Sequence, residues 1–258
     1  MFSKSLEKYI NSLRVKKHRT THHCFVAEGE KLINELIHSS LVIEKILFTD
    51  KLIDKGILTG KVAEEHIVVL EEHEMKRISE LQSPSPVMAI VQIPEYKIEI
   101  SLLNSGLHLV LDSIQDPGNM GTIIRIADWF GIQNIFCSES CVDAYHPKVV
   151  QASMGSIARV QVFEKNILEV LSVSTLPKIL TDIHSESTIY NNQLPGYGMI
   201  VIGSEGQGVS AEVKKLCTHA ISIPKFGKAE SLNAAVATGI ICAALAEKNA
   251  KQNIQSVN

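Results

Sequence analysis

The second half of the chain alternates short apolar segments with amphipathic or polar ones, and this alternation constrains the fold more than any other feature. The apolar segments that read as buried strands are residues 107–112, 134–137, 161–163, 178–183, 199–203 and 220–224. Strands that alternate with helices pair in parallel, and helices then cover both faces of the sheet. We therefore expect an α/β domain with a mostly parallel sheet, whose ligands bind beyond the carboxyl ends of the strands.

The first ninety or so residues repeat the alternation on a smaller scale. Strand patterns occur at residues 24–29, 43–50, 67–70 and 88–93, and helical patterns at residues 30–39 and 71–81. Pro94 ends this unit, and residues 95–105 read as a linker or a short helix. The predicted organisation is a small α/β domain over residues 1–94, a linker over 95–105 and a larger domain over 106–258.

Composition excludes several classes of protein. The chain of 258 residues is 45% apolar and 21% charged, which is typical of a globular protein, and no apolar run reaches the roughly 18 residues of a membrane-spanning helix. The basic N-terminus lacks the apolar stretch of a secretory signal, so we expect a cytoplasmic protein. Five scattered cysteines without a C-x-x-C pair indicate free thiols.

The most basic stretch is residues 1–31, with seven Lys or Arg against three Glu. Because the whole chain has a net charge of −3, any surface for nucleic acid has to be confined to one face. The candidates for contact with phosphate are Lys16, Lys17 and Arg19, although a solvated helix face is an equally good interpretation. The nearby His18, His22, His23 and Cys24 have no second ligand pair at zinc-finger spacing, so no metal site is predicted.

Three loops at the expected ligand edge carry polar residues. In the first, residues 116–119 (DPGN) read as a turn, and a helix is predicted over Thr122–Phe130. Asn119 and Arg125 then face an open edge of the sheet. An arginine in a first helical turn is disfavoured by the helix dipole, so its presence there suggests a use.

The second loop is rich in glycine and runs from Gly203 to Ser210. It nearly matches a phosphate-binding loop, but Val209 stands where the lysine is required and Glu205 would repel a phosphate. The glycine spacing is not that of a dinucleotide site, and the chain has neither a G-x-S-x-G elbow nor a catalytic-thiol signature. The loop can offer backbone groups to a small ligand that is not strongly anionic, such as an adenosine bearing a sulfonium amino acid.

The third loop lies in ISIPKFGKAESLNAAVATGI, residues 221–240. This stretch reads as a strand, a loop with Lys225 and Lys228, and a helix of small residues that begins near Ser231. A helix of Ala and Gly buries useful area only where its partner approaches closely. Ser231 and Asn233 at its start are placed to hold a ligand, although an ordinary capped core helix fits this stretch equally well.

Together the three segments QDPGNMGTIIRIADWFG, VIGSEGQGVS and ISIPKFGKAESLNAAVATGI resemble, in order and spacing, the three motifs of the SpoU (TrmH) family of SPOUT methyltransferases. The resemblance covers roughly residue 107 to the C-terminus. It implies methyl transfer from S-adenosyl-L-methionine to a ribose 2′-hydroxyl of RNA, a deep trefoil knot, and a homodimer formed through the C-terminal domain. The N-terminal unit is similar to the ribosomal-protein-like substrate-binding domain of the rRNA members, which favours rRNA over tRNA.

The resemblance also implies roles for individual residues. The positions that match the catalytic motifs are Asn119, Arg125, Glu205, Ser231 and Asn233. Those expected to bind the cofactor, mainly through backbone atoms, are Gly203, Ile223 and Leu232, with help from Thr181 and Asp182. No catalytic metal is needed, because the methyl donor is itself a cation.

Arg125 is the family's favoured candidate for activating the ribose hydroxyl. Because a guanidinium keeps its proton in proteins, we expect Arg125 to position the target phosphate and to stabilise the developing alkoxide. Lys225 and Lys228 are candidates for contact with RNA phosphate, although exposed loop lysines are more often simply solvated.

Three alternative functions remain open. The chain could be a tRNA 2′-O-methyltransferase, since the KFGKAES loop does not decide the substrate. It could be a non-catalytic RNA-binding protein on the same fold, which the complete set of motif residues disfavours. It could also methylate a base nitrogen, and the combination of Arg, Ser and Asn favours ribose instead.

Overall fold

The structure is a computed structural model that describes residues 2–50, 52, 62–190 and 194–255. The chain divides into two compact units. The first contains the residues up to Glu95 together with Asp143–Arg159, and the second contains Tyr96–Val142 and the chain from Val160 onward. In the part of the chain described, no helix has the length and apolar character needed to cross a membrane.

The first unit is a small α/β fold. Its elements are α1 (Lys4–Ser12), α2 (Lys16–His22), β1 (Cys24–Glu28), α3 (Glu30–Ile37), β2 (Ile43–Thr49), η2 (Glu64–His66), β3 (Ile67–Leu70), α4 (Glu72–Ile78), β4 (Val87–Gln92), α6 (Pro147–Ser153) and η4 (Ser156–Ala158). The strand order is β1-β4-β2-β3, with β4 antiparallel to both neighbours and β2 parallel to β3. The strands and helices predicted before residue 94 are therefore present.

The second unit contains the parallel sheet. Its elements are η3 (Leu102–Asn104), β5 (Leu107–Asp112), α5 (Pro117–Trp129), β6 (Asn134–Cys137), β7 (Gln161–Glu164), α7 (Ile167–Val173), β8 (Lys178–Thr181), β9 (Gly198–Gly203), α8 (Ala211–Leu216), β10 (His219–Ile221) and α9 (Ala234–Gln255). The strand order is β10-β8-β9-β5-β6-β7, and all five strand pairs are parallel. This confirms the predicted fold class, an α/β fold with a mostly parallel sheet.

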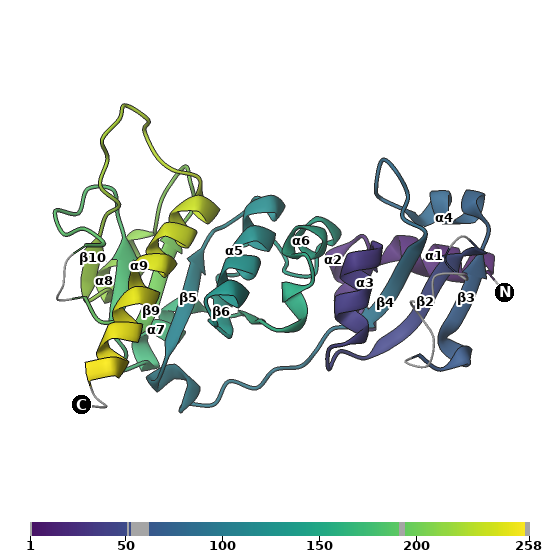
Figure 1. Ribbon diagram of the computed structural model, residues 1–258, viewed down its shortest axis with the longest axis horizontal. Coiled ribbons are helices and arrows are strands. Elements are labelled where there is room, and N and C mark those ends of the chain that lie inside the picture. Colours follow the sequence, from purple (N-terminus) through teal and green to yellow (C-terminus); the bar gives the residue numbers. More distant parts are fainter. Residues whose placement is uncertain (1, 51, 53–61, 191–193, 256–258) are drawn as a thin grey trace. The chain divides into compact units, whose positions relative to one another are not determined.

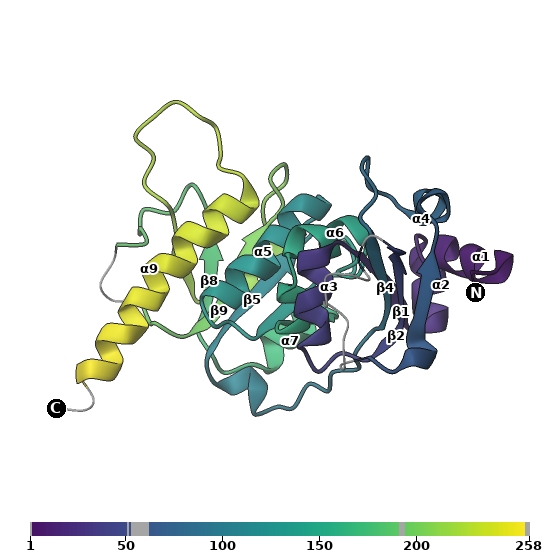
Figure 2. The same ribbon diagram turned by 45° about the vertical axis from the view of Figure 1, so that its right-hand side comes forward.

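Helices cover both faces of this sheet. Alternate side chains of the central strands, such as Val110 and Val201, pack in one core cluster with residues of α7 and α8. The intervening side chains face the opposite side, where α5 and α9 lie next to each other (Figures 1 and 2). The two helices approach closely because α9 is built from small residues: a Cβ added at Gly239 would lie 3.6 Å from Cδ1 of Ile126. The close packing predicted for this helix is confirmed.

One segment departs from a simple division into two consecutive domains. Asp143–Arg159, which carries α6 and η4, packs with the first unit although it falls between β6 and β7 of the second. Tyr145 contacts Phe25 of β1 with their ring centroids 5.1 Å apart. Arg159 pairs with Glu35 at 2.7 Å. The first unit is thus assembled from two separate stretches of sequence.

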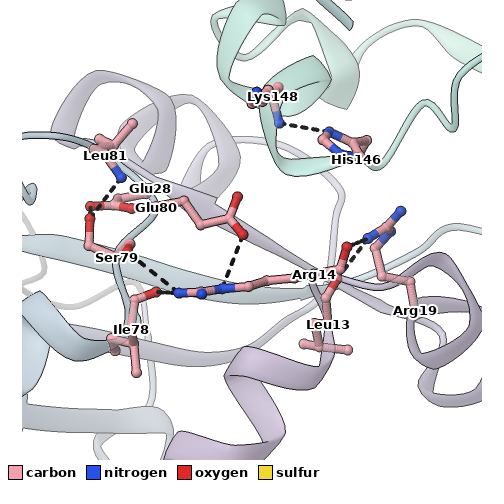
Figure 3. A network of polar contacts seen from close by, with 10 residues as sticks. All are labelled: Leu13, Arg14, Arg19, Glu28, Ile78, Ser79, Glu80, Leu81, His146 and Lys148. Atoms are coloured by element: carbon pink, nitrogen blue, oxygen red, sulfur yellow. Dashed lines mark hydrogen bonds and ion pairs between the residues drawn. The ribbon is translucent and has the colours of Figure 1, made fainter. Parts of the chain in front are cut away.

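Arg19 lies at the centre of this assembly. Its side chain is only 2% exposed, and its guanidinium contacts one carboxylate oxygen of Asp143 at 2.5 and 2.9 Å. It also donates to the backbone carbonyls of Leu13 and Arg14, both at 2.8 Å (Figure 3). The structure therefore does not support Arg19 as a residue that contacts RNA, because its hydrogen-bonding groups are engaged inside the unit.

Two helix starts differ from the sequence-based expectation. The residues Asp116–Asn119 are not a separate turn: Asp116 caps α5, accepting from the backbone N–H of Asn119 at 2.8 Å, and Pro117 is the first helical residue. The C-terminal helix begins at Ala234 instead of near Ser231, because Asn233 is its cap and accepts from the N–H groups of Ala235 and Val236. Both ends follow ordinary capping chemistry.

Candidate functional site

The candidate site lies at the carboxyl edge of the parallel sheet. β9 pairs with β8 on one side and β5 on the other, and β10 pairs with the far side of β8. Parallel strands bring their carboxyl ends to the same edge. The chain segments that follow β5, β8, β9 and β10 therefore meet there, and they include all three loops selected from the sequence.

Asn119, Glu205 and Asn233 form one hydrogen-bonded network. Oε1 of Glu205 accepts from the side-chain amides of Asn119 and Asn233, the latter at 3.1 Å, and from the backbone N–H of Ala234 at 3.3 Å. Asn233 Nδ2 also donates to Oδ1 of Asn119 at 2.8 Å. Each of the three residues comes from a different motif, so the network fastens α5, the glycine-rich loop and the start of α9 to one another.

The glycine-rich loop is folded back tightly on its own strand. The N–H of Gly208 donates to the carbonyl of Ser204 at 2.9 Å. Asp112, at the end of β5, accepts from the N–H of Ser210 at 2.8 Å. A Cβ added at Gly203 would lie 2.2 Å from the carbonyl carbon of Gly208 and 2.3 Å from the backbone nitrogen of Val209. Glycine is therefore required at 203 by the backbone that folds over it.

Replacing Gly203 with alanine should displace this loop. The clash is with backbone atoms, so no side chain can move aside, and we expect a loss of about 1–3 kcal/mol or more in unfolding free energy. The affinity for the expected cofactor, S-adenosylmethionine, should fall about tenfold or more, which corresponds to about 1.4 kcal/mol of binding free energy. Urea denaturation and calorimetric titration measure the two effects.

Gly206→Ala is the matched control for this prediction. Gly206 is in the same loop, but a Cβ added there has no atom within 4 Å. It should leave stability and cofactor affinity nearly unchanged. Equal effects of the two alanines would show that the crowding at Gly203 is not what fixes the loop.

Arg125 is not part of the hydrogen-bonded network. It is exposed on α5, and within the described residues no hydrogen bond or ion pair involves it. Because α5 begins at Pro117, Arg125 lies in the third turn and not the first, so the helix-dipole argument for its use was wrong. Arg125 lies on the exposed side of the helix, whereas Ile123 and Ala127 are fully buried.

Ser231 is also outside the network. It is exposed in the loop before α9, and the described residues provide no partner for its hydroxyl. Of the five predicted catalytic residues, the structure brings three into contact and leaves Arg125 and Ser231 at the surface. Such exposed groups are available to a bound substrate or to a second copy of the chain.

The predicted cofactor-binding residues are at the same edge. Gly203, Ile223 and Thr181 are half-buried, and Leu232 is 44% exposed. The end of β9 and the segment after β10 thus combine the half-buried backbone of Gly203 with apolar side chains, which suits a flat adenosine group. This composition fits S-adenosylmethionine, whose binding requires backbone groups and apolar walls more than charges.

Two of these residues are already engaged within the chain. The hydroxyl of Thr181 donates to the carbonyl of Val201 at 2.9 Å. Asp182 accepts from the N–H of His184 at 2.9 Å and pairs with Lys214 at 3.3 Å. The His184 N–H, and then Lys214, lower the pKa of Asp182 below its usual value. The Thr181 side chain therefore joins the end of β8 to β9, and the Asp182 side chain shapes the loop after β8.

The basic residues selected from the sequence are all exposed except Arg19. Lys225 and Lys228 flank Phe226, whose side chain is 96% exposed, in the loop before α9. Lys16 and Lys17 are on α2 in the first unit. A loop that combines two lysines with a bare aromatic ring is typical of single-stranded nucleic-acid contact, because bases stack on aromatic side chains.

Sequence reasoning missed two residues that hold the site in place. Asp112 anchors the glycine-rich loop and Asp116 caps α5. The signal for Asp116 was present, because Asp followed by Pro is a common helix start. Asp112 could be identified only as a polar residue that ends an apolar strand.

Two family models match the chain. The model of the SpoU rRNA Methylase family matches residues 106–243, and that of the MRM3-like substrate binding domain matches residues 7–89. The first match covers more than half of the chain and contains all three loops of the candidate site.

Similar proteins cover nearly the whole chain. The 23S rRNA (guanosine(2553)-2′-O)-methyltransferase RlmP of Bacillus subtilis is 29% identical over 242 residues, 89% of this chain and 91% of the relative. A TrmH family tRNA/rRNA methyltransferase of Staphylococcus saprophyticus is 32% identical over 236 residues, 84% of this chain and 92% of the relative.

Solved structures show the same fold. An RNA methyltransferase of the TrmH family from Porphyromonas gingivalis has a TM-score of 0.84 at 35% identity and covers 95% of this chain and 98% of its own. The SpoU methyltransferase AviRb from Streptomyces viridochromogenes, in complex with AdoMet, also has a TM-score of 0.84 and covers 96% and 98%. At 22% identity, AviRb supports the fold alone.

Proposed function

Because this chain belongs to the SpoU rRNA methylase family, we propose that it transfers the methyl group of S-adenosylmethionine to a ribose 2′-hydroxyl of rRNA. The observation that carries the proposal is the network of Asn119, Glu205 and Asn233. It joins the three motif segments at the edge where α/β sheets bind their ligands.

The chain's own groups have a positioning role in this reaction. S-adenosylmethionine, when bound, supplies an electrophilic methyl group, and the protein has to hold the ribose oxygen in line with it. Gly203, Ile223 and Leu232 would hold the cofactor, and the loop built on Thr181 and Asp182 would support it. The network fixes the two sides of this site relative to one another.

Arg125 is proposed to act on the substrate. Its exposed guanidinium has no partner among the described residues, so it is free to bind an RNA phosphate and to stabilise negative charge on the ribose oxygen. Ser231, which is exposed in the loop before α9, would contact the same nucleotide.

The rRNA substrate is inferred from the relatives. RlmP is named for a guanosine of 23S rRNA, and it matches both units of this chain. We propose that Lys16, Lys17, Lys225 and Lys228 contact the phosphates of that RNA, since all four are exposed. Arg19 is omitted from this group because it is buried against Asp143.

We also propose a homodimer formed through α5 and α9. Their outer surfaces carry Trp129, which is 83% exposed, Val236 at 51% and Ile240 at 36%. Trp129 lies one turn beyond Arg125, so a second copy that covers the tryptophan would also enclose the arginine. Light scattering should give twice the 28.4 kDa mass of the chain, and the mass of one chain would refute the dimer.

The trefoil knot and the cytoplasmic location remain parts of the proposal. The chain around Ser222 runs beside residues 187–189, with hydrogen bonds of 2.8 and 3.0 Å, which supports a C-terminal stretch threaded near another loop. The five cysteines are free thiols, as a reducing compartment requires. An experimental chain trace and cell fractionation test the two points.

The function is tested by mass spectrometry of nuclease-digested rRNA and tRNA from cells with and without the protein. The expected result is the loss of one 2′-O-methyl nucleotide from rRNA. Loss from tRNA would keep the chemistry and overturn the substrate. An unchanged pattern in both RNAs, together with no turnover of cofactor on rRNA, would contradict the proposed activity.

A further inference from the structure

A cavity of about 450 Å³ lies within the first unit, and its lining residues all belong to that unit. Its walls come from the end of α2, the start of β1, the loop before β2 and the chain after β4. The lining residues that matter here are His22, His23, Val42, Glu44, Gln92 and Pro94. Its volume is in the range of pockets that bind small molecules.

Glu44 is directed into this cavity by an irregularity of the sheet. Ile43 pairs with Val91 and Lys45 pairs with Ile90, so Glu44 is an extra residue in β2, a β-bulge. Bulges redirect side chains and are frequent next to functional sites. Without the bulge, Glu44 would be paired with a residue of β4 in the sheet.

One carboxylate oxygen of Glu44 is held by the protein. Oε2 accepts from the hydroxyl of Tyr9 at 3.2 Å and from the thiol of Cys24 at 3.1 Å. Burial, and then the contact with Glu44, raise the pKa of Cys24 to about 11. Burial also raises the pKa of Tyr9, so both groups keep their protons and donate at neutral pH.

The other oxygen of Glu44 is available to a ligand. Among the described residues, no donor contacts Oε1. Gln92 also lines the cavity, while Val42, 56% exposed, and Pro94 provide apolar surface. A flat group with an N–H donor on its edge and apolar faces matches these walls.

Charge distinguishes among the possible ligands. Glu44 and Glu95 both line the cavity, so a phosphate group would be repelled from it. No group of three or more metal-ligating side chains occurs in the described part of the chain, which disfavours a cation site. The cavity adjoins the end of α2, whose exposed Lys17 can hold the backbone of an RNA strand outside it.

We propose that this cavity binds a splayed base of the substrate RNA that carries an exocyclic amino group, the amino group donating to Oε1 of Glu44. Adenine, cytosine and guanine have such a group. Uracil has no exocyclic amino group, and its one edge donor, N3–H, lies between two carbonyl oxygens that a carboxylate repels. Single-stranded RNA is commonly read in this way, with unstacked bases hydrogen-bonded along their edges. The inference rests on the proposed function, because it assigns a specificity pocket to the same substrate.

The test compares two probes that differ only in the hydrogen-bonding groups at one edge of the base. Hexacytidylate has an amino group where hexauridylate has a carbonyl. Binding of each is measured by fluorescence anisotropy to the full chain saturated with S-adenosylmethionine, which keeps the probes out of the cofactor site. We expect hexacytidylate to bind about fivefold or more tightly, the low end of what a base contact contributes. No preference in the wild-type chain would overturn the proposal.

Three variants test whether the preference for hexacytidylate arises in this cavity. Glu44→Gln preserves the shape of the side chain and should reduce the ratio of the two affinities to near one. Val42→Trp, at an exposed position of the rim, should fill the cavity and have the same effect on the ratio, even if it changes both affinities. Glu64→Gln removes an exposed carboxylate elsewhere in the unit and should preserve the ratio. A preference that survives in Glu44→Gln would overturn the assignment.

Methyl transfer to rRNA by the same preparations separates this proposal from the proposed function. If the wild-type chain methylates rRNA but shows no preference between the probes, only the base pocket is wrong. If it neither methylates rRNA nor binds either probe, the proposed function fails and the pocket assignment fails with it.

Discussion

Replacing Arg125 with alanine should lower the rate of methyl transfer by about 10²-fold or more, while the affinity for S-adenosylmethionine stays unchanged. Arg125 is exposed and has no partner among the described residues, so its loss breaks no internal contact. A preorganised positive group beside a developing alkoxide contributes about 10²–10³ to the rate in comparable sites. Single-turnover methylation and calorimetric titration of the cofactor measure the two quantities.

Arg125→Lys serves as the graded control. A lysine retains the charge but lacks the planar fork that binds a phosphate with two hydrogen bonds, so it should recover only part of the lost rate. Arg125→Ala that methylates at the wild-type rate would exclude the proposed role. A variant that loses cofactor affinity as well would instead place Arg125 in the cofactor site.

Asp143→Ala should lower the unfolding free energy by about 3–5 kcal/mol, the usual result of removing one partner from a buried ion pair. The substitution leaves the guanidinium of Arg19, 2% exposed, without its carboxylate. The carbonyls of Leu13 and Arg14 remain as acceptors, but they do not neutralise the charge. The shift is measured by urea denaturation followed by circular dichroism.

The pair between Glu35 and Arg159 gives the comparison for Asp143. Its nitrogen–oxygen distance is also short, at 2.7 Å, but both side chains are 45% exposed. Exposed pairs contribute about 0–1 kcal/mol, so Glu35→Ala should have a small effect. If both alanine variants lose the same small amount of unfolding free energy, Asp143 is not what stabilises the buried positive charge of Arg19.

The strands of this protein were predictable because each is a short apolar run bounded by turn residues. The parallel sheet followed from their alternation with helices. The helix ends were harder to predict. Gly118 made residues 116–119 resemble a turn, although Asp116 is the cap of α5 and Pro117 is its first residue. The local sequence did contain the signal for a helix start, Asp116 followed by Pro117. The prediction failed because Gly118 was given more weight than these two residues.

The site was predictable only in part, for a different reason. Asn119, Glu205 and Asn233 could be selected from their motifs, but their mutual hydrogen bonds depend on how three strands are ordered in the sheet. Arg19 illustrates the converse. It resembled a surface cation because its counter-ion, Asp143, is 124 residues away in the sequence. Partners so distant are fixed by tertiary packing and leave no trace in local pattern.

The assembly of the first unit from two stretches of sequence limits how this unit, which we propose contacts the substrate RNA, can be exchanged between relatives. A chimera that imports only the residues up to Glu95 would receive β1 without its α6 cover and Arg19 without Asp143. A chimera therefore has to import two separate stretches of sequence, the residues up to Glu95 and Asp143–Arg159. During divergence the two stretches are likewise expected to change together, so that recognition of a new RNA requires matched changes in both.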